Sequence, residues 1–302
     1  MVEVIELASD LAYLKTSFVN VYFAGNAESW VLIDTGIPGY AATILEAATA
    51  RFGGAAPKAI LLTHGHFDHA ACALELAKFW HVPVYAHHLE FPYLKGESAY
   101  PQKDPTVGGA MGFISRFFPS RTANISEVLL DLPETRMVPG LEGWTWIPTP
   151  GHAPGQVAFW REHDRVLIAG DTLATVNLDS WRALVGWKKR LSRPALPFTY
   201  DWEAAALSIR ILAALRPRVL ACGHGQPLSG ETLADDFLAF AETFTGPKKG
   251  RYSVEAAVTN QNGVVYEPPV PKDKLPTMTA GVVAGVFLLA GVVYSRRGKK
   301  DR

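Results

Sequence analysis

Short apolar runs bounded by turn residues dominate the first part of the chain. Four of them, at 4–7, 12–15, 19–24 and 30–34, predict an antiparallel sheet. An Ala-rich stretch at 41–52 predicts a helix that stops at Gly53-Gly54. Later runs predict further strands and two more helices, the strands at 58–62, 83–86, 128–131, 143–147, 156–160, 165–169 and 218–222 and the helices at 70–80 and 234–244.

Two irregular stretches interrupt this rhythm. Residues 91–125 are rich in Pro, Gly and aromatic residues, and we expect a lid with one short helix around 107–118; a plain surface insertion is the alternative. Residues 172–197 carry Trp181, Trp187 and the basic run 188–190, and can line a pocket with the lid. Tyr200, which follows, can donate a hydrogen bond to a substrate carbonyl oxygen or serve only in packing.

The most informative stretch is Thr63-His64-Gly65-His66-Phe67-Asp68-His69, directly after the apolar run 59–62. His64 and His66 leave the same face if the strand pitch persists through them. Asp68 and His69 approach from the following turn. Four donors packed so closely suit two neighbouring cations better than one. The alternative is a polar loop in which Asp68 caps the next helix.

Other polar residues also follow predicted strands and stand among glycines. His152, Asp171 and His224 have this setting, which gives the backbone the freedom to aim them at a common centre. Asp34 is either an acceptor that orients a ligand histidine or a simple turn residue. We interpret the adjacent His87 and His88 as structural, because no further candidate ligand stands at a metal-binding spacing from them.

Composition narrows the class of protein. The chain has 302 residues, of which 48% are hydrophobic, enough for one large α/β domain. The net charge is +0 and the basic residues do not form a long early run, so nucleic acid is not an expected partner. Cys72 and Cys222 are too few for a disulfide framework and favour a reducing compartment. The first residues do not have the apolar pattern of a secretory signal.

The end of the chain predicts a membrane anchor. We expect the catalytic domain at 1–245 and a Pro-rich linker at 246–276, with a small hairpin formed by 253–258 and 263–266. Residues 277–294 carry no charge, and 277–295 are predicted as a transmembrane helix followed by a basic tail at 296–302. A buried terminal helix is the alternative. We expect a single-pass C-terminal anchor with the catalytic domain facing the cytoplasm.

Taken in order, these motifs resemble the metallo-β-lactamase superfamily over about 15–245. The resemblance implies an α/β fold, a four-layer αββα sandwich with two metals at one edge of the sheets. It also implies the ligands: His64, His66 and His152 for one metal, Asp68, His69 and His224 for the other, and Asp171 as the bridge. Nitrogen and oxygen donors favour two Zn²⁺, with iron or manganese as alternatives.

Departures within the superfamily point to one branch. A dizinc β-lactamase would be expected to carry Cys where Asp171 stands, which disfavours antibiotic hydrolysis. Flavodiiron proteins typically carry Glu at the position of His66, so this difference disfavours the flavodiiron branch. Asp171 instead resembles glyoxalase II, the lactonases and the nuclease branch. Nucleases of this fold need an extended basic surface or an added domain to bind phosphates, and the sequence indicates neither. The resemblance therefore implies a hydrolase of small esters, lactones or thioesters.

In the expected reaction, a metal-bridging hydroxide attacks the substrate carbonyl while Asp68 orients it. Two other classes remain open. A mononuclear-iron persulfide dioxygenase of the same fold would use an overlapping ligand set that includes His152 and Asp171. A membrane-tethered binding protein would keep the site without turnover.

Overall fold

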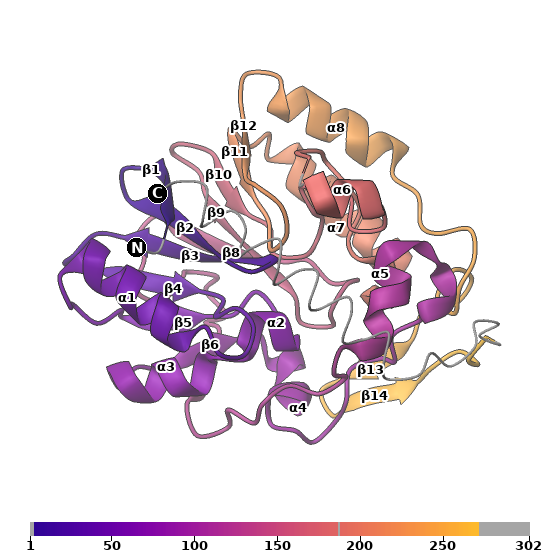
Figure 1. Cartoon of the computed structure of the whole chain (residues 1–302), viewed down its shortest axis with the longest axis horizontal. Coiled ribbons are helices and arrows are strands. Elements are labelled where there is room, and N and C mark those ends of the chain that lie inside the picture. Colours follow the sequence, from indigo (N-terminus) through magenta and orange to yellow (C-terminus); the bar gives the residue numbers. More distant parts are fainter. Residues whose placement is uncertain (1–2, 187, 272–302) are drawn as a thin grey trace, which may run out of the picture. The chain divides into compact units, whose positions relative to one another are not determined.

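A computed structural model describes residues 3–186 and 188–271, and their arrangement is seen in Figure 1. Two β-sheets face each other across a buried apolar layer, and helices cover the outer face of each sheet. The αββα sandwich predicted for this chain is confirmed. The feature of this fold that matters for function is that strands of both sheets end at the same edge of the sandwich.

The first sheet has seven strands, which lie side by side in the order of the sequence. Strands β1 to β4 pair antiparallel, whereas β4 to β7 pair parallel because longer crossover segments join them. The strands are β1 (Val4–Ala8), β2 (Leu11–Thr16), β3 (Val19–Gly25), β4 (Trp30–Ile33), β5 (Ala59–Leu61), β6 (Val84–Ala86) and β7 (Leu129–Asp131).

The second sheet has five strands in the order β12-β11-β10-β9-β8. Strands β10 and β11 are parallel, and every other pair is antiparallel, so β8, β10 and β11 all run in one direction. Their carboxyl ends therefore lie at one edge. The strands are β8 (Trp144–Pro148), β9 (Val157–Arg161), β10 (Val166–Ile168), β11 (Val219–Ala221) and β12 (Leu228–Ser229).

Each sheet packs against apolar side chains on both of its faces. The layer between the sheets includes Tyr22 and Ile33 from the first sheet and Trp144 and Phe159 from the second. Helices α1 (Ala41–Phe52) and α3 (Ala73–Trp80) close the outer face of the first sheet. Helices α7 (Trp202–Ala214) and α8 (Leu233–Thr243) close that of the second.

Short helices fill the two irregular stretches. Residues 91–125 contain one α-helix more than expected, and Figure 1 shows α5 and α6 on the same side of the sandwich. The elements are α2 (Phe67–Ala70), η1 (His88–Glu90), α4 (Phe91–Leu94), η2 (Pro105–Val107), α5 (Gly109–Ile114), η3 (Ser115–Phe117), α6 (Trp181–Gly186) and η4 (Leu196–Phe198).

After α8, a small hairpin packs against the domain. Its strands are β13 (Val258–Asn260) and β14 (Gly263–Tyr266), so the first strand begins later than predicted. The segment before it is tied down, because the Tyr252 hydroxyl donates to the Gln102 carbonyl at 2.7 Å and Arg251 lies 3.1 Å from Glu267. Residues up to Pro271 thus form one compact unit with the sandwich.

The predicted transmembrane helix at 277–295 and the basic tail at 296–302 lie outside the described residues. Within 3–186 and 188–271, no helix is both long and apolar enough to cross a membrane.

Candidate metal centre

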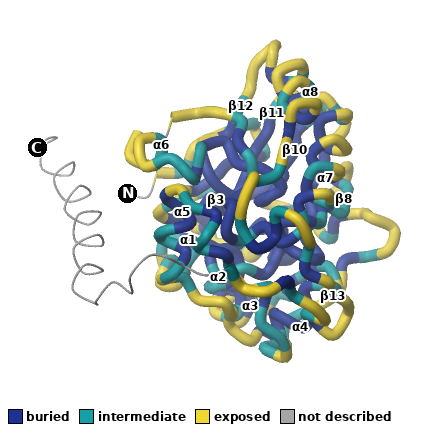
Figure 2. Tube along the Cα trace, turned by 90° about the vertical axis from the view of Figure 1, so that its right-hand side faces the viewer, coloured by how far each residue is buried: buried dark blue, intermediate teal, exposed yellow. Residues whose placement is uncertain are grey.

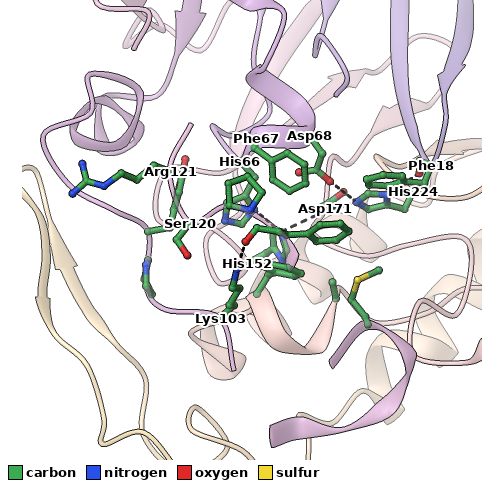
Figure 3. A pocket seen from close by; sticks show the side chains of 17 residues that line it. Phe18, His66, Phe67, Asp68, Lys103, Ser120, Arg121, His152, Asp171 and His224 are labelled. Atoms are coloured by element: carbon green, nitrogen blue, oxygen red, sulfur yellow. Dashed lines mark hydrogen bonds and ion pairs between the residues drawn. The ribbon is translucent and has the colours of Figure 1, made fainter. Parts of the chain in front are cut away.

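Every donor of the predicted cluster lies in a segment that follows the end of a strand. The chain leaves β5 at Leu61 and passes through His64 and His66 into the short helix α2, which carries Asp68 and His69. The segments after β8, β10 and β11 carry the other three donors, His152, Asp171 and His224. Because β8, β10 and β11 end at one edge, these three side chains meet those from β5 there. Figure 3 shows His66, Asp68, His152, Asp171 and His224 directed at one another.

Three imidazoles form the first group. Nε2 of His64 lies 3.0 Å from Nδ1 of His66, which lies 3.1 Å from Nε2 of His152. All three rings are buried or nearly so. An N–H on the central His66 nitrogen could serve these contacts only by leaving that nitrogen without a lone pair for metal, whereas one cation between the three nitrogens satisfies the lone pairs of all three.

A carboxylate and two imidazoles form the second group. Oδ2 of Asp68 lies 3.5 Å from Nε2 of His224 and 3.9 Å from Nε2 of His69. The three donor atoms lie within 4.8 Å of one another, close enough to hold one ion. The two groups are therefore separate triads that lie next to each other.

Asp171 stands between the triads. Its Oδ2 is 3.0 Å from Nε2 of His224 and 3.5 Å from Nε2 of His152, and its Oδ1 is 3.6 Å from Nε2 of His69. One carboxylate thus faces imidazoles of both groups. This geometry is what two ions sharing one ligand require.

Unsatisfied polar atoms test whether this set fits metal. Among the described residues, Nε2 of His69 and Oδ1 of Asp171 are buried and have no hydrogen-bond partner. Leaving such buried atoms unpaired is costly, and a bound cation would supply the missing partner. Gly223 leaves the space that they need, because a Cβ there would lie 2.1 Å from Oδ1 of Asp171. The donors present therefore fit a pair of cations.

Burial and charge set the protonation of the donors. Burial holds the pKa of His64 and of His66 well below the usual range, and it lowers the pKa of His152 to about 4. Burial alone would raise the pKa of Asp171, but the imidazoles of His224 and His69 outweigh it and hold that pKa well below normal. The first triad is thus neutral and the shared carboxylate anionic near neutral pH, which is the state that metal binding needs.

Outer partners fix the imidazoles in orientation. Nδ1 of His69 lies 2.8 Å from Oδ2 of Asp34, and Nδ1 of His224 lies 2.9 Å from the Phe18 carbonyl oxygen. Nδ1 of His152 lies 3.2 Å from the Thr199 hydroxyl. With Nδ1 engaged in this way, Nε2 of each ring is left for the centre. Of the two interpretations of Asp34, the structure favours the acceptor.

Glu90 is a buried residue that sequence reasoning missed. Its Oε2 accepts hydrogen bonds from the Gly65 amide at 2.8 Å and from the Tyr100 hydroxyl, and its Oε1 accepts one from the Gly155 amide at 2.6 Å. Gly65 separates His64 from His66, and Gly155 belongs to the loop of His152. One carboxylate therefore ties together the two loops that supply the first triad.

Aromatic and apolar side chains wall the pocket above the donors, which has a volume of about 610 Å³ including its open mouth. The lid contributes Tyr100, Met111 and Phe118, and the second irregular stretch contributes Ala195 and Phe198. The Tyr100 ring lies 4.4 Å from the His66 ring. Two cationic residues, Lys103 and Arg121, also line the pocket, on the side away from Asp68 (Figure 3).

Of the two interpretations of Tyr200, the structure favours packing. Tyr200 packs with Trp202 and Leu196 in the apolar layer under α7 and α8, and its hydroxyl is paired with Thr259. In the described part of the chain, the residues that line the pocket include Tyr100 but not Tyr200. His87 and His88 also lie outside the centre; His88 is half exposed, 3.6 Å from Asp131.

Comparison with known proteins supports this description. A family model described as "Metallo-beta-lactamase superfamily" matches residues 14–224. The probable metallo-hydrolase YflN of Bacillus subtilis (strain 168) is 41% identical over 241 residues, which cover 78% of this chain and 91% of that protein. The hydroxyacylglutathione hydrolase GloC of Haemophilus influenzae (strain ATCC 51907 / DSM 11121 / KW20 / Rd) is 28% identical over 38% of this chain and 50% of its own.

Solved structures give the same fold. The B3 metallo-beta-lactamase BLEG-1 is 27% identical, with a TM-score of 0.53 over 79% of this chain and 99% of that one. A B3 metallo-beta-lactamase with an active-site glutamic acid is 18% identical, with a TM-score of 0.54 over 79% of this chain and 87% of that one. At this identity the second likeness supports only the sandwich architecture.

Proposed function

The chain belongs to the metallo-beta-lactamase superfamily, and on that premise we propose a dinuclear zinc hydrolase that cleaves an ester, a lactone or a thioester. The coarser statement, that it is a metal-dependent hydrolase, rests on the named metallo-hydrolases among its relatives and on its dimetal donor set. The single observation that carries the proposal is Asp171, whose carboxylate faces both triads.

We assign His64, His66 and His152 to the first ion and Asp68, His69 and His224 to the second, with Asp171 shared. Five imidazoles and two carboxylates, with neither thiolate nor thioether, match the donor preference of Zn²⁺. When bound, two such ions acidify a water molecule and polarise a carbonyl oxygen. Iron and manganese accept overlapping donors, so the metal must be measured.

The chain's own side chains shape the remainder of the site. Asp68 lines the pocket as well as belonging to the second triad, so its carboxylate can also orient a water molecule held at the centre. The aromatic walls formed by Phe67, Phe118 and Phe198 keep bulk water from the reacting carbonyl and offer an apolar surface to an acyl group. Lys103 and Arg121 favour a substrate that carries an anionic group.

Two similarities bear on the choice of substrate. The name of GloC denotes hydrolysis of a thioester, but that relative matches only part of this chain. BLEG-1 is a β-lactamase, so a cephalosporin belongs in the substrate panel although Asp171 disfavours it. The mainly apolar pocket, with Lys103 and Arg121 on its wall, suits small activated carbonyl compounds that carry an anionic group.

Metal content and turnover test the proposal together. Protein purified with zinc should bind two metal ions per chain by elemental analysis and hydrolyse at least one member of a panel of lactones, thioesters, aryl esters and a cephalosporin. A single iron per chain with oxygen uptake on a persulfide would instead establish the dioxygenase. Two bound metals without any turnover would support a binding protein.

His66→Ala should remove metal from the first site and lower activity by about a hundred-fold or more. The matched control is His163→Ala, because the side chain of His163 is 71% exposed and outside the centre. Retention of two metals per chain by the His66 variant would defeat the ligand assignment.

A further inference from the structure

Three large apolar side chains are exposed together beside the pocket. On α6, Trp181 is 50% exposed and Val185 is 86% exposed, and their spacing of four residues puts them on one face of the helix. Phe117, from η3, is 40% exposed. The ring of Phe113 joins the two segments, since it lies 5.9 Å from the Trp181 ring and 6.1 Å from the Phe117 ring.

The opposite side of the same segments is packed. Ala183 and Leu184 of α6 and Ile114 of α5 lie against a buried cluster that includes Met111 and Val176. Figure 2 shows α6 at the edge of the molecule in the colours of exposed and intermediate residues. The core therefore uses one side of α6, and the exposed apolar residues on the other side do not contribute to it.

Charge around this face is one-sided. Residues 105–126 and 180–200 carry seven Arg or Lys side chains and neither Asp nor Glu, whereas the whole chain has a net charge of +0. Four of the seven, Arg182, Lys188, Lys189 and Arg190, are exposed next to the apolar residues in sequence. The acidic groups that contact these segments include Asp104, which accepts hydrogen bonds from Thr106, and Asp179, which lies 4.0 Å from Arg193. Asp236 shares a shallow hollow with Lys189 and Arg190.

We propose that the exposed face formed by Phe117, Trp181, Arg182, Val185 and residues 188–190 docks onto the surface of an anionic lipid bilayer. We call it the docking face. Tryptophan and aliphatic side chains with surrounding lysine and arginine are the composition that favours the bilayer interface, where rings enter the headgroup layer and cations meet acidic headgroups. Duplex nucleic acid would use the cations, but it offers no apolar layer for Val185.

The docking face connects with the candidate active site through shared side chains. Met111 belongs to the buried cluster beneath α6, Phe118 packs against that cluster, and both also line the pocket. The packing beneath α6 is thus continuous with the pocket wall. Substrates that partition into lipid would be concentrated next to it.

A fluorescent label tests the docking face in the full-length chain. Val185→Cys gives a single accessible thiol, because Cys72 and Cys222 are both buried, and it is labelled with an environment-sensitive fluorophore. The matched control is the same label at Leu207→Cys on α7, where Leu207 is 56% exposed. Because both labels are in the same full-length chain, any membrane binding by residues 272–302 affects both equally.

With vesicles that contain phosphatidylglycerol, the label at 185 should shift to the blue and brighten about two-fold or more, and nitroxide lipids should quench it, while the label at 207 stays unchanged. Phosphatidylcholine vesicles should give a much smaller response. In the background of the label at 185, Lys188→Glu with Lys189→Glu should weaken the apparent partition by about ten-fold or more. The charge control is Lys58→Glu with Lys78→Glu.

Four outcomes would overturn the proposal: an unresponsive label at 185, an equal response at 207, a response that rises with protein concentration before vesicles are added, or an equal response to duplex DNA. The third would identify a second copy of the chain as the partner. Neither the metal nor hydrolysis enters the readout, so the result is independent of the proposed function.

Discussion

Asp34 Oδ2 lies 2.8 Å from Nδ1 of His69, and the same carboxylate accepts hydrogen bonds from the amide and the hydroxyl of Thr63, each at 2.8 Å. Of the two residues that Asp34 holds, His69 is a member of the donor cluster and Thr63 directly precedes His64 in the sequence. The backbone at Asp34 is left-handed, with a φ of 60°. This position therefore combines a left-handed backbone with a carboxylate that orients His69, one donor of the second triad.

We predict that Asp34→Asn weakens metal binding at the second triad by about 10- to 100-fold. Asn tolerates the left-handed backbone, but it has one acceptor oxygen where the carboxylate has two. Its NH₂ group would therefore face at least one of the three donors, which are the Thr63 amide, the Thr63 hydroxyl and Nδ1 of His69. Competition with a chromophoric chelator measures the effect. Asp10→Asn, which alters a partly buried pair with Arg161 outside the donor cluster, is the control. Unchanged affinity would show that His69 is held by packing alone.

Glu90 gives a second prediction, because it accepts hydrogen bonds from three different segments. In Glu90→Gln one oxygen becomes an amide group that faces N–H or O–H donors, so we expect a loss of about 1–3 kcal/mol in the free energy of unfolding. Under native conditions, metal should also leave the first triad faster, since the loops of His64 and His152 lose their common anchor.

Urea unfolding and the rate of metal release to a chelator separate these two effects. Glu97→Gln, at an exposed position in the next turn of the chain, should change neither quantity. If stability falls but metal release is unaltered at saturating metal, Glu90 supports the fold only. If metal release quickens with folding intact, it positions the ligands.

The two tyrosines near the site give a third prediction. Tyr200→Phe should leave kcat and KM within about two-fold, because its hydroxyl is paired with Thr259 away from the pocket lining. Tyr100→Phe should lower kcat by about three-fold or more, because it removes the hydroxyl that binds Glu90 beside His66. Steady-state kinetics on one substrate tests both. A larger effect for Tyr200 would favour the other interpretation of this residue, a hydrogen bond to the substrate carbonyl.

Local patterns explain why the donors were predictable. His64, His66, Asp68 and His69 lie within six residues after a strand, and the other donors follow strand ends among glycines. Helix α1 was predicted to the residue, since alanine-rich propensity and Gly53 at φ 63° define it locally. Family resemblance, rather than local pattern, supplied the pairing of the sheets.

The parts that were missed depend on tertiary contacts. Helix α7 was not predicted, because apolar residues lie on both of its faces, with Leu207 and Ile211 exposed at 56% and 42%. Glu90 meets Gly155 across 65 residues of sequence and has no motif around it. Tyr100 and Tyr200 both stand in aromatic, irregular stretches, and only the packing decides which one faces His66.

Asp179 provides a prediction about pH. This residue joins the two irregular stretches, since its carbonyl accepts a hydrogen bond from the Ala110 amide at 2.9 Å. Its side chain is 14% exposed, and among the described residues its Oδ1 is buried and has no hydrogen-bond partner. Burial raises the pKa of Asp179 to about 6, although Arg193 opposes the shift.

The sign of the effect follows from proton linkage. Between about pH 4 and pH 6 the folded state holds a proton on Asp179 that the unfolded chain has released, so the stabilisation from this group is full below about pH 4 and is lost as pH rises through 6. Above that pH both states are ionised, and the cost of the buried charge stays constant. A pKa displaced by about two pH units corresponds to roughly 3 kcal/mol at most.

Asp179→Asn should therefore be more stable than the parent chain by about 1–3 kcal/mol near pH 8, and the difference should shrink towards zero below about pH 4.5. The loss of the contact with Arg193 reduces the gain. Urea unfolding of metal-free protein measures it, because chelation removes the protonation of metal ligands from the comparison. Asp235→Asn, at a side chain that is 73% exposed, should give a flat difference. A gain that does not change with pH would mean that Asp179 is ionised throughout, with Arg193 as its effective partner.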